Sequence, residues 1–322
     1  MSNQNFSATG PGNYPGNVLA HRQAAAAYTP PHSAQGAAPN VPQQPAAGNP
    51  LKNFFRQYKL FIKLPSGADY YPQNVVNYTP TGEIGIMAMT GQDELILKNP
   101  DALLNGEALV QVISSCAPSI LNVKQLLTND IDALITAIRY VTYDDKLESI
   151  IKCPECSHEN LYKIDLEHTL NNMSYLDSEY VVHLDSGLSV YLKPYGFTEV
   201  LKSLHTQFEQ SKLARAITNP GLTDEERNHI LNDVFVSLSK TAFELLLSTV
   251  VRVVNESQGI DVSERAFIAE FLKNSDRSVT DRLQKTVTDI NAVGVEKKFT
   301  PVCEKCNHSW TSEIDFNPVN FS

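Results

Sequence analysis

The sequence predicts an α+β protein that is mostly helical with a small β portion. Two Cys-x-x-Cys pairs, Cys153 with Cys156 and Cys303 with Cys306, begin the similar stretches CPECSHENLYKIDL and CEKCNHSWTSEIDF. Between the two pairs, apolar residues recur mainly at helical spacing. The combination predicts a split zinc ribbon, built from two Cys-x-x-Cys knuckles, that flanks an inserted helical bundle.

Length, composition and charge limit the class of protein. The 322 residues are 42% apolar, which is ordinary for a globular protein of about two domains. The formal net charge of -10 disfavours a nucleic-acid partner, because it would repel a phosphate backbone. No apolar run approaches the ~20 residues of a membrane span, and the N-terminus shows no secretory signal. We therefore expect a reducing cytosol, where paired cysteines favour metal or redox chemistry over disulfides.

The first fifty residues differ in composition from the rest. Residues 1–50 are rich in alanine, proline, glutamine, asparagine and glycine and contain no acidic residue. Such a segment has too few large apolar side chains to offset the entropy lost on ordering. We expect a disordered tail, and its composition favours a passive extension over a segment that folds onto a partner.

Residues 51–150 are expected to form an N-terminal α+β domain. Its clearest elements are a strand around Tyr58, Leu60 and Ile62 that runs into a turn at Pro65 and Gly67, a strand at 83–89 and a helix at 129–140. The strands are indicated by alternating apolar residues. In the helix, apolar residues recur at helical spacing, and Asn129 or Asp130 is the expected N-terminal cap.

Residues 169–296 are expected to hold a hairpin followed by a helical bundle. The segment 179–194 alternates around an Asp-Ser-Gly turn. From 197 to 293 the pattern is helical, with Thr223 and Glu226 as a capping box. The apolar helical stripes are Val200, Leu201, Leu204 and Phe208, then Ile230, Val234 and Leu238, then Val279, Leu283, Val287 and Ile290. We expect these stripes to form a core rather than a partner-binding groove.

The four paired cysteines are expected to bind one structural Zn²⁺ per chain. The two halves of the ribbon would span residues 151–168 and 297–318, with residues 157–302 between the second and third cysteines. Closing a loop of that length costs about 4 to 5 kcal/mol. A structural zinc site contributes about 10 to 16 kcal/mol, which exceeds that cost. Four sulfur ligands leave no open position for water, so catalysis at this metal is disfavoured.

Other interpretations of the cysteines and histidines stay open at this point. His158 and His308 would be third ligands if each cysteine pair formed its own site. The Cys-Pro-Glu-Cys pair also fits redox chemistry, although strand-forming residues follow it instead of the helix of thioredoxin-like proteins. Cys116 stands far from both pairs and is interpreted as a small buried apolar residue. The sequence contains no dinucleotide, Walker, Gly-x-Ser-x-Gly or His-Glu-x-x-His motif, so we expect no enzyme.

Several segments before the first cysteine pair have a specific order. They are LPSGADYYPQNVV, GEIGIMAMTGQDELIL, NPDALLNGEALVQVISSC, LLTNDIDALITAIRYVTY and then CPEC. The positions of interest within them are Leu64, Pro65, Ser66, Tyr71, Met89, Thr90, Asp93, Glu94, Asp130, Arg139, Cys153 and Cys156. In this order the chain resembles the baseplate hub family of T4-like contractile-tailed bacteriophages, most closely over about residues 55–165.

The resemblance implies a non-enzymatic phage tail protein that contacts other baseplate or tail proteins. It would be a baseplate hub subunit or a hub assembly factor. It would act in the host cytoplasm during assembly and lie in the virion tail baseplate if retained there. The stretch 89–97 is the first expected partner contact, and a strand entering a loop is its other interpretation.

A nucleic-acid-binding regulator is the alternative function, because zinc ribbons also occur in such proteins. The ribbon flanks carry a modest basic group that would contact phosphate, namely Lys152, Lys163, Lys297, Lys298 and Lys305. The sequence does not predict an oligomeric state.

Overall fold

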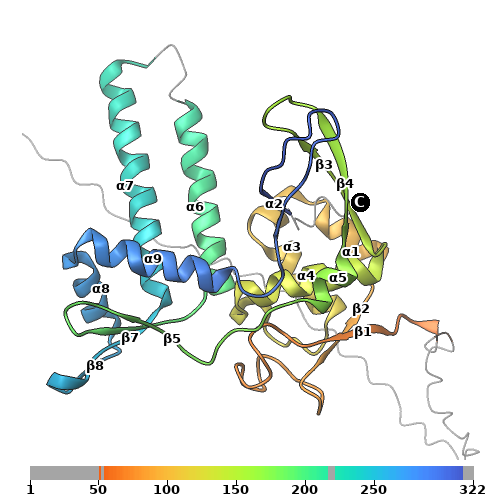
Figure 1. Cartoon of the computed structure of the whole chain (residues 1–322), viewed down its shortest axis with the longest axis horizontal. Helices are drawn as coiled ribbons and strands as arrows, with labels where there is room; N and C mark the ends of the chain where they lie inside the picture. The colour runs from red at the N-terminus through yellow and green to blue at the C-terminus, as the bar shows by residue number, and fades with distance from the viewer. Residues whose placement is uncertain (1–50, 52–53, 217–221, 315–322) are drawn as a thin grey trace, which may run out of the picture. The chain divides into compact units, whose positions relative to one another are not determined.

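Figure 1 shows the computed structural model of the chain. The structure describes residue 51, residues 54–216 and residues 222–314. The chain divides into two units, Met1–Asn53 and Phe54–Ser322, and every element named below belongs to the second unit. The predicted tail, residues 1–50, lies outside the described residues. Within the described part, no helix is both long enough and apolar enough to cross a membrane.

Two short strands and four α-helices make up the first part of the described chain. In order they are β1 (Tyr58–Ile62), β2 (Ile84–Met87), α1 (Gly91–Leu97), α2 (Pro100–Leu104), α3 (Glu107–Cys116), the 3₁₀ turn η2 (Val123–Gln125) and α4 (Thr128–Thr142). β1 and β2 pair antiparallel. Both strands and α4 were predicted, and the buried residues Leu134 and Ile138 place the apolar face of α4 in the core.

The second part alternates strands and helices. The order is β3 (Lys146–Lys152), β4 (Glu159–Asp165), α5 (Leu166–Asn171), β5 (Tyr180–His183), β6 (Ser189–Leu192), α6 (Phe197–Ala216), α7 (Asp224–Thr249), β7 (Val250–Asn255), the 3₁₀ turn η3 (Glu256–Gln258), β8 (Ile260–Val262), α8 (Arg265–Asn274), α9 (Arg277–Asn291), β9 (Lys298–Phe299) and β10 (Ser312–Glu313). The predicted hairpin is β5–β6, which turns at Gly187 with a φ of 79°. The capping box of Thr223 and Glu226 is present at the start of α7. These elements confirm the α+β class.

The expectation of helices throughout 197–293 is wrong for residues 250–262. There β7 and β8 join the β5–β6 hairpin in an antiparallel sheet of order β5-β6-β7-β8. The run of β-branched residues from Val250 to Val254 is the local reason, because such side chains pack well on a pleated surface. The insert is therefore a sheet covered by helices and not a pure helical bundle.

Two apolar cores lie in the described chain. The first joins β1, β2 and helices α1 to α4, with Leu64, Ile84 and Leu134 fully buried. The second lies between the four-stranded sheet and the helices α7, α8 and α9. The predicted stripe of α9 is confirmed, because Leu283, Val287 and Ile290 are buried in this second core. The stripe of α6 is only partly core, since Leu204 is 51% exposed.

The first turn of α4 contacts three other parts of the chain. The Asn129 side-chain amide donates to the carbonyl oxygens of Ile290 and Val293 at the end of α9, at 3.1 and 2.7 Å. The Thr128 backbone amide donates to the Tyr195 oxygen before α6, at 3.0 Å. Further along the same turn, Asp132 pairs with Lys297 just before β9.

The predicted cap of α4 is wrong. The helix begins at Thr128 with Leu127 as its N-cap, and both Asn129 and Asp130 are buried inside the first turn. The Asp130 carboxylate accepts hydrogen bonds from the Ser66 backbone amide at 3.0 Å and from the Tyr71 hydroxyl at 2.5 Å. These two polar residues would satisfy free helix amides at a cap, but here they link separate parts of the chain.

Burial sets the protonation of Asp130. Desolvation raises its pKa to about 6, although the hydrogen bonds from Tyr71 and Ser66 act in the opposite direction. The folded pKa therefore lies above the ordinary value of 3.8. Between about pH 4 and pH 6, the folded protein keeps a proton that the unfolded chain has lost, so this carboxyl contributes less to stability as the pH rises.

Replacing Asp130 with asparagine is expected to remove this pH dependence. The free energy of unfolding, measured by urea titration, should be compared for the wild type and Asp130→Asn at several pH values. The wild-type value minus the variant value should decrease from about pH 4 to about pH 6, because only the wild type loses a proton there. A difference that stays constant with pH would contradict the perturbed titration of Asp130.

Candidate metal centre

Two knuckles of the same geometry hold the four paired cysteines. The first knuckle is the turn between β3 and β4, where the Cys153 amide donates to the His158 oxygen and the Ser157 amide donates to the Cys153 oxygen, both at 2.9 Å. The second knuckle lies between β9 and β10 and repeats both bonds at 2.9 Å, at residue numbers higher by 150. Ser157 and Asn307 occupy the same left-handed position, each with a φ of 56°.

The fold brings all four predicted cysteines together. Cys153 Sγ lies 3.7 Å from Cys306 Sγ, and Cys156 Sγ lies 3.6 Å from Cys303 Sγ. All four sulfurs lie within 4.8 Å of one another. A tetrahedral centre with metal–sulfur bonds of about 2.3 Å places its sulfurs about 3.8 Å apart, so this arrangement has the size that zinc requires.

The surroundings of Cys303 favour its deprotonated form, whereas at Cys306 the His308 amide lowers the pKa but burial and hydrogen bonds to the other three thiols outweigh it and raise the pKa. Burial raises the pKa of Cys303, but backbone amides of Cys306 and Lys305 point at its sulfur and lower the pKa below the ordinary value. Hydrogen bonds from the neighbouring thiols act in the same direction. The thiolate is the form of cysteine that ligates metals.

Direct contacts join the two knuckles in addition to the sulfurs. The buried Asn160 side chain accepts from the Glu304 amide at 2.9 Å and donates to the His158 oxygen at 3.0 Å. The Tyr162 hydroxyl donates to the Val302 oxygen at 3.0 Å. Neither Asn160 nor Tyr162 was predicted as a site residue from the sequence. The available signal was a difference between the two similar stretches. Asn160 in the first stretch corresponds to Trp310 in the second, so the asparagine is not part of the repeated pattern.

The competing interpretations of these residues receive no support. Among the described residues, the group spaced to hold a metal contains the four cysteines and neither His158 nor His308. The His308 ring instead lies near Trp310, with ring centroids 6.0 Å apart. The first pair stands in a β-hairpin and not at a strand-to-helix junction, which disfavours the redox interpretation. Cys116 is buried, and its burial raises the thiol pKa to about 12, as expected for a core residue.

The lysines of the ribbon are largely paired with carboxylates. Lys152 lies 3.3 Å from Glu159, and Lys163 lies 2.9 Å from Glu148. Both pairs join opposite residues of β3 and β4. Lys297 pairs with Asp132. Three of the five lysines considered for phosphate binding are thus neutralised within the protein, which weakens the nucleic-acid alternative.

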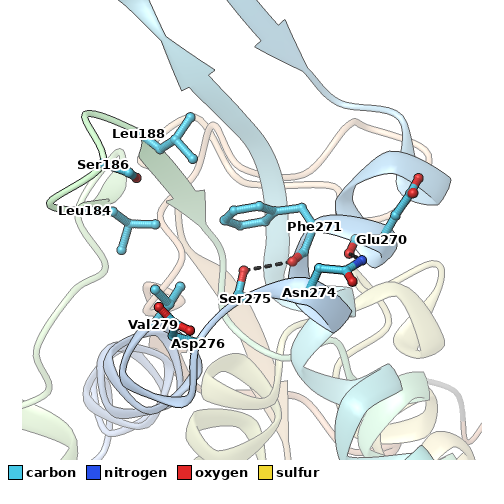
Figure 2. A pocket seen from close by; sticks show the side chains of 9 residues that line it. All are labelled: Leu184, Ser186, Leu188, Glu270, Phe271, Asn274, Ser275, Asp276 and Val279. Atoms are coloured by element: carbon cyan, nitrogen blue, oxygen red, sulfur yellow. Dashed lines mark hydrogen bonds between the residues drawn. The ribbon is translucent and has the colours of Figure 1, made fainter.

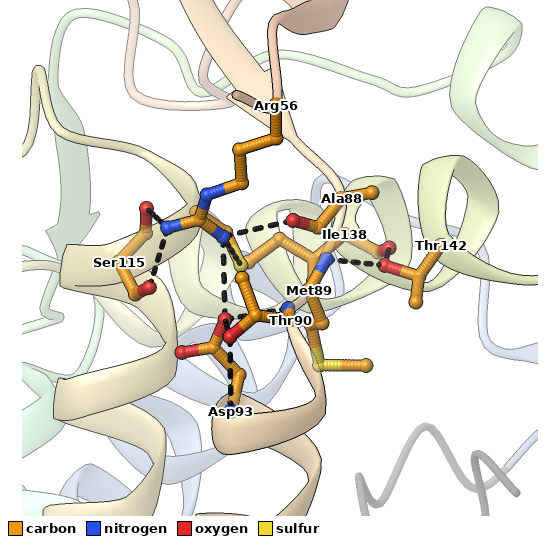
Figure 3. Close-up of polar contacts among 9 residues, drawn as sticks. Arg56, Ala88, Met89, Thr90, Asp93, Ser115, Ile138 and Thr142 are labelled. Carbon is orange, nitrogen blue, oxygen red and sulfur yellow. Dashed lines mark hydrogen bonds and ion pairs between the residues drawn. The ribbon is translucent and has the colours of Figure 1, made fainter. Parts of the chain in front are cut away.

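A partly buried polar network surrounds Arg56, just before β1 (Figure 3). Its guanidinium donates to the Ala88 oxygen at 2.8 Å, to Asp93 at 3.2 Å, and to the Ser115 oxygen and hydroxyl, both at 2.7 Å. Burial alone would raise the pKa of Asp93, but hydrogen bonds from Thr90 and the charge of Arg56 lower it below the ordinary value. Asp93 is therefore ionised and holds the start of β1 against α1 and α3.

The stretch 89–97 contains α1, and its role as a partner contact stays a prediction. Its interpretation as a strand entering a loop is wrong, because Thr90 and Asp93 form a capping box at the start of α1. The sequence pattern T-x-x-D was the missed signal. Met89, Asp93 and Leu97 are buried, and Leu95 is 69% exposed.

An open cavity of about 430 Å³ lies beside the β5–β6 turn and the corner between α8 and α9 (Figure 2). Its lining includes Leu184, Leu188, Phe271 and Val279, with polar side chains around them. The Ser275 hydroxyl and the Asn274 amide donate to backbone oxygens at the end of α8, at 2.7 and 2.8 Å. These donors are used to terminate the helix, and the lining shows no pairing of nucleophile and base typical of catalysis.

The fold and the cysteine site together define an α+β protein with a closed four-thiol centre. The family model described as T4 bacteriophage base plate protein matches residues 56–320. The chain therefore belongs to the T4 bacteriophage base plate protein family. Searches of curated proteins and of solved structures each found no match. The family match confirms the resemblance seen over residues 55–165 and extends it through the insert and the second knuckle.

Metal content should respond equally to the loss of a cysteine from either knuckle. Purified protein is expected to carry about one zinc per chain, and Cys153→Ser and Cys303→Ser should each lose it entirely, because the two knuckles complete one tetrahedron. Plasma mass spectrometry of the metal, with the protein concentration measured in parallel, gives the ratio. The control His308→Ala should keep the metal. Loss of only half the metal in each cysteine variant would indicate two separate sites.

The left-handed residue of the second knuckle is expected to be sensitive to substitution. Asn307→Ala should lower the free energy of unfolding by about 1 kcal/mol, because alanine adopts a positive φ less readily than asparagine. Asn307→Gly is the matched control and should change stability by much less, since glycine adopts this conformation without steric cost. Both values come from denaturant titration of metal-loaded protein. Equal losses in the two variants would show that the asparagine side chain matters and the backbone conformation does not.

Proposed function

We propose that this chain is a non-enzymatic baseplate hub subunit or hub assembly factor that acts through contacts with other baseplate proteins. The observation that carries the proposal is the family match over residues 56–320, which includes both cysteine knuckles. The protein would work in the host cytoplasm during assembly. As a subunit it would then lie in the baseplate of the virion tail.

Zinc is proposed as a structural clip and not as a catalyst. Cys153, Cys156, Cys303 and Cys306 would supply four thiolates, and a fully occupied tetrahedron leaves no position for a substrate or an activated water. A metal held there would fasten the β3–β4 hairpin to the segment that follows the insert. Because few ligand sets form in an unfolded chain, the binding free energy of the metal stabilises the folded state.

This arrangement suits a protein that is added to an assembly in a fixed order. The Arg56 network holds the start of the N-terminal domain, and the first turn of α4 holds the end of the insert and the residue Tyr195 before α6. The proposed clip would hold the segment after the insert. Surfaces on all three parts would then keep fixed shapes before any partner arrives, which reduces the ordering cost of binding.

Loss of this chain should stop tail assembly. A phage carrying a stop codon early in this reading frame is expected to yield no complete baseplates by electron microscopy of infected cells, and the wild-type chain supplied in trans should restore them. Complete infectious tails in its absence would overturn the proposal. Quantitative mass spectrometry of purified wild-type particles then separates the two roles. A fixed small-integer ratio to other tail proteins indicates a hub subunit, whereas abundance in the lysate with absence from particles indicates an assembly factor.

A further inference from the structure

The buried side chain of Asn160 links the two knuckles through backbone groups. Asn160 is 1% exposed and lies on β4, directly after the first knuckle. Its Oδ1 accepts from the Glu304 amide of the second knuckle at 2.9 Å, and its Nδ2 donates to the His158 oxygen at 3.0 Å. The same His158 oxygen accepts from the Cys153 amide, which closes the first knuckle. One side chain therefore ties the closing bond of one knuckle to the backbone of the other.

The Glu304 amide stands next to the amides that meet a candidate metal ligand. In the second knuckle, the Lys305 and Cys306 amides point at the Cys303 sulfur. Each peptide unit is planar, so fixing the Glu304 amide restricts how the amides after it can turn. Asn160 therefore favours the conformation in which these amides meet the Cys303 sulfur.

A comparison of the two stretches explains why this bond forms once and not twice. Pro154 occupies the position of Glu304 in the first knuckle, and proline has no backbone N–H. Trp310 occupies the position of Asn160 in the second stretch, and its indole has a donor but no acceptor. The reciprocal bond would need both missing groups. The two stretches thus differ at both partners of the bond, and the knuckles are joined in this way from one side only.

We propose that Asn160 is a positioning residue of the metal centre, and that its bond to the Glu304 amide sets how tightly the four cysteines hold zinc. This role rests on the proposed zinc clip. The second pair of sulfurs comes from a segment far along the chain from the first. A bond that fixes this segment before the metal arrives removes part of the ordering cost of binding. Partners outside the ligand set typically change metal affinity about 10- to 100-fold when they are lost.

The zinc affinity of the full chain tests this role, measured by competition between the protein and a chromophoric chelator for Zn²⁺. Asn160→Ala should raise the Kd for Zn²⁺ about 10- to 100-fold. Glu304→Pro should raise it in the same range, because it removes the N–H that the asparagine oxygen accepts. The first knuckle has the same backbone hydrogen bonds with Pro154 in place, so the turn accepts proline at this position.

Two further variants separate the bond from other effects. Glu304→Ala removes the same exposed side chain as Glu304→Pro but keeps the N–H, so its Kd should equal that of the wild type. The double variant Asn160→Ala/Glu304→Pro should bind zinc as weakly as Asn160→Ala and no more weakly, because both changes break one bond. Urea titration with excess chelator measures the stability of the metal-free chain. A merely structural Asn160 would lower that stability and leave the Kd unchanged.

An unchanged Kd in Asn160→Ala or Glu304→Pro, or effects of the two changes that multiply in the double variant, would overturn the proposal. If Asn160→Ala does not fold, the comparison of Glu304→Pro with Glu304→Ala decides the matter alone. A wild type that binds no zinc would overturn the structural clip itself, and this role with it. Failure of the clip is therefore seen in the wild type, whereas failure of the positioning role alone is seen only in the variants.

Discussion

The buried first turn of α4 is the contact on which the remaining structure depends. Asp130 receives hydrogen bonds from Ser66 and Tyr71, which places the loop after β1. Asn129 binds the end of α9, and Asp132 pairs with the lysine that precedes β9. Buried polar groups are costly unless their partners are correctly placed, so these contacts favour one arrangement of the segments over others.

The cysteine centre and the turn of α4 fasten the insert in different ways. The turn of α4 holds the insert by neutral hydrogen bonds from Thr128 and Asn129. The cysteines bring together residues on either side of the insert, and contacts of Asn160 and Tyr162 align the two knuckles independently of any metal. A metal bound there would add stability to an arrangement that the polypeptide already favours.

Predictions from local sequence patterns were correct where contacts between residues close in the sequence determine the structure. The hairpin at 179–194, the capping box at Thr223 and the helix that became α4 all depend on neighbours within a few residues. Residues 250–262 were assigned to helix although Val250 to Val254 favour a strand. Pairing with β6, which lies far earlier in the chain, decides that segment. The exposure of Leu204, Leu231 and Phe235 on α6 and α7 could not be predicted either, because an apolar stripe has the same spacing whether or not a core covers it.

The sequence by itself determined the four cysteines, the doubled knuckle and the family resemblance, because each is a matter of residue identity and order. The tertiary structure decided which contacts these residues make. From the sequence, Asn129 and Asp130 are ordinary candidates for a helix cap. In the folded chain, Asp130 instead accepts hydrogen bonds from Ser66 and Tyr71, and Asn129 donates to the end of α9. The four sulfurs likewise meet only because the insert returns the chain to its starting point. Contacts between residues so far apart leave no periodic signal, since they depend on the path of the whole chain.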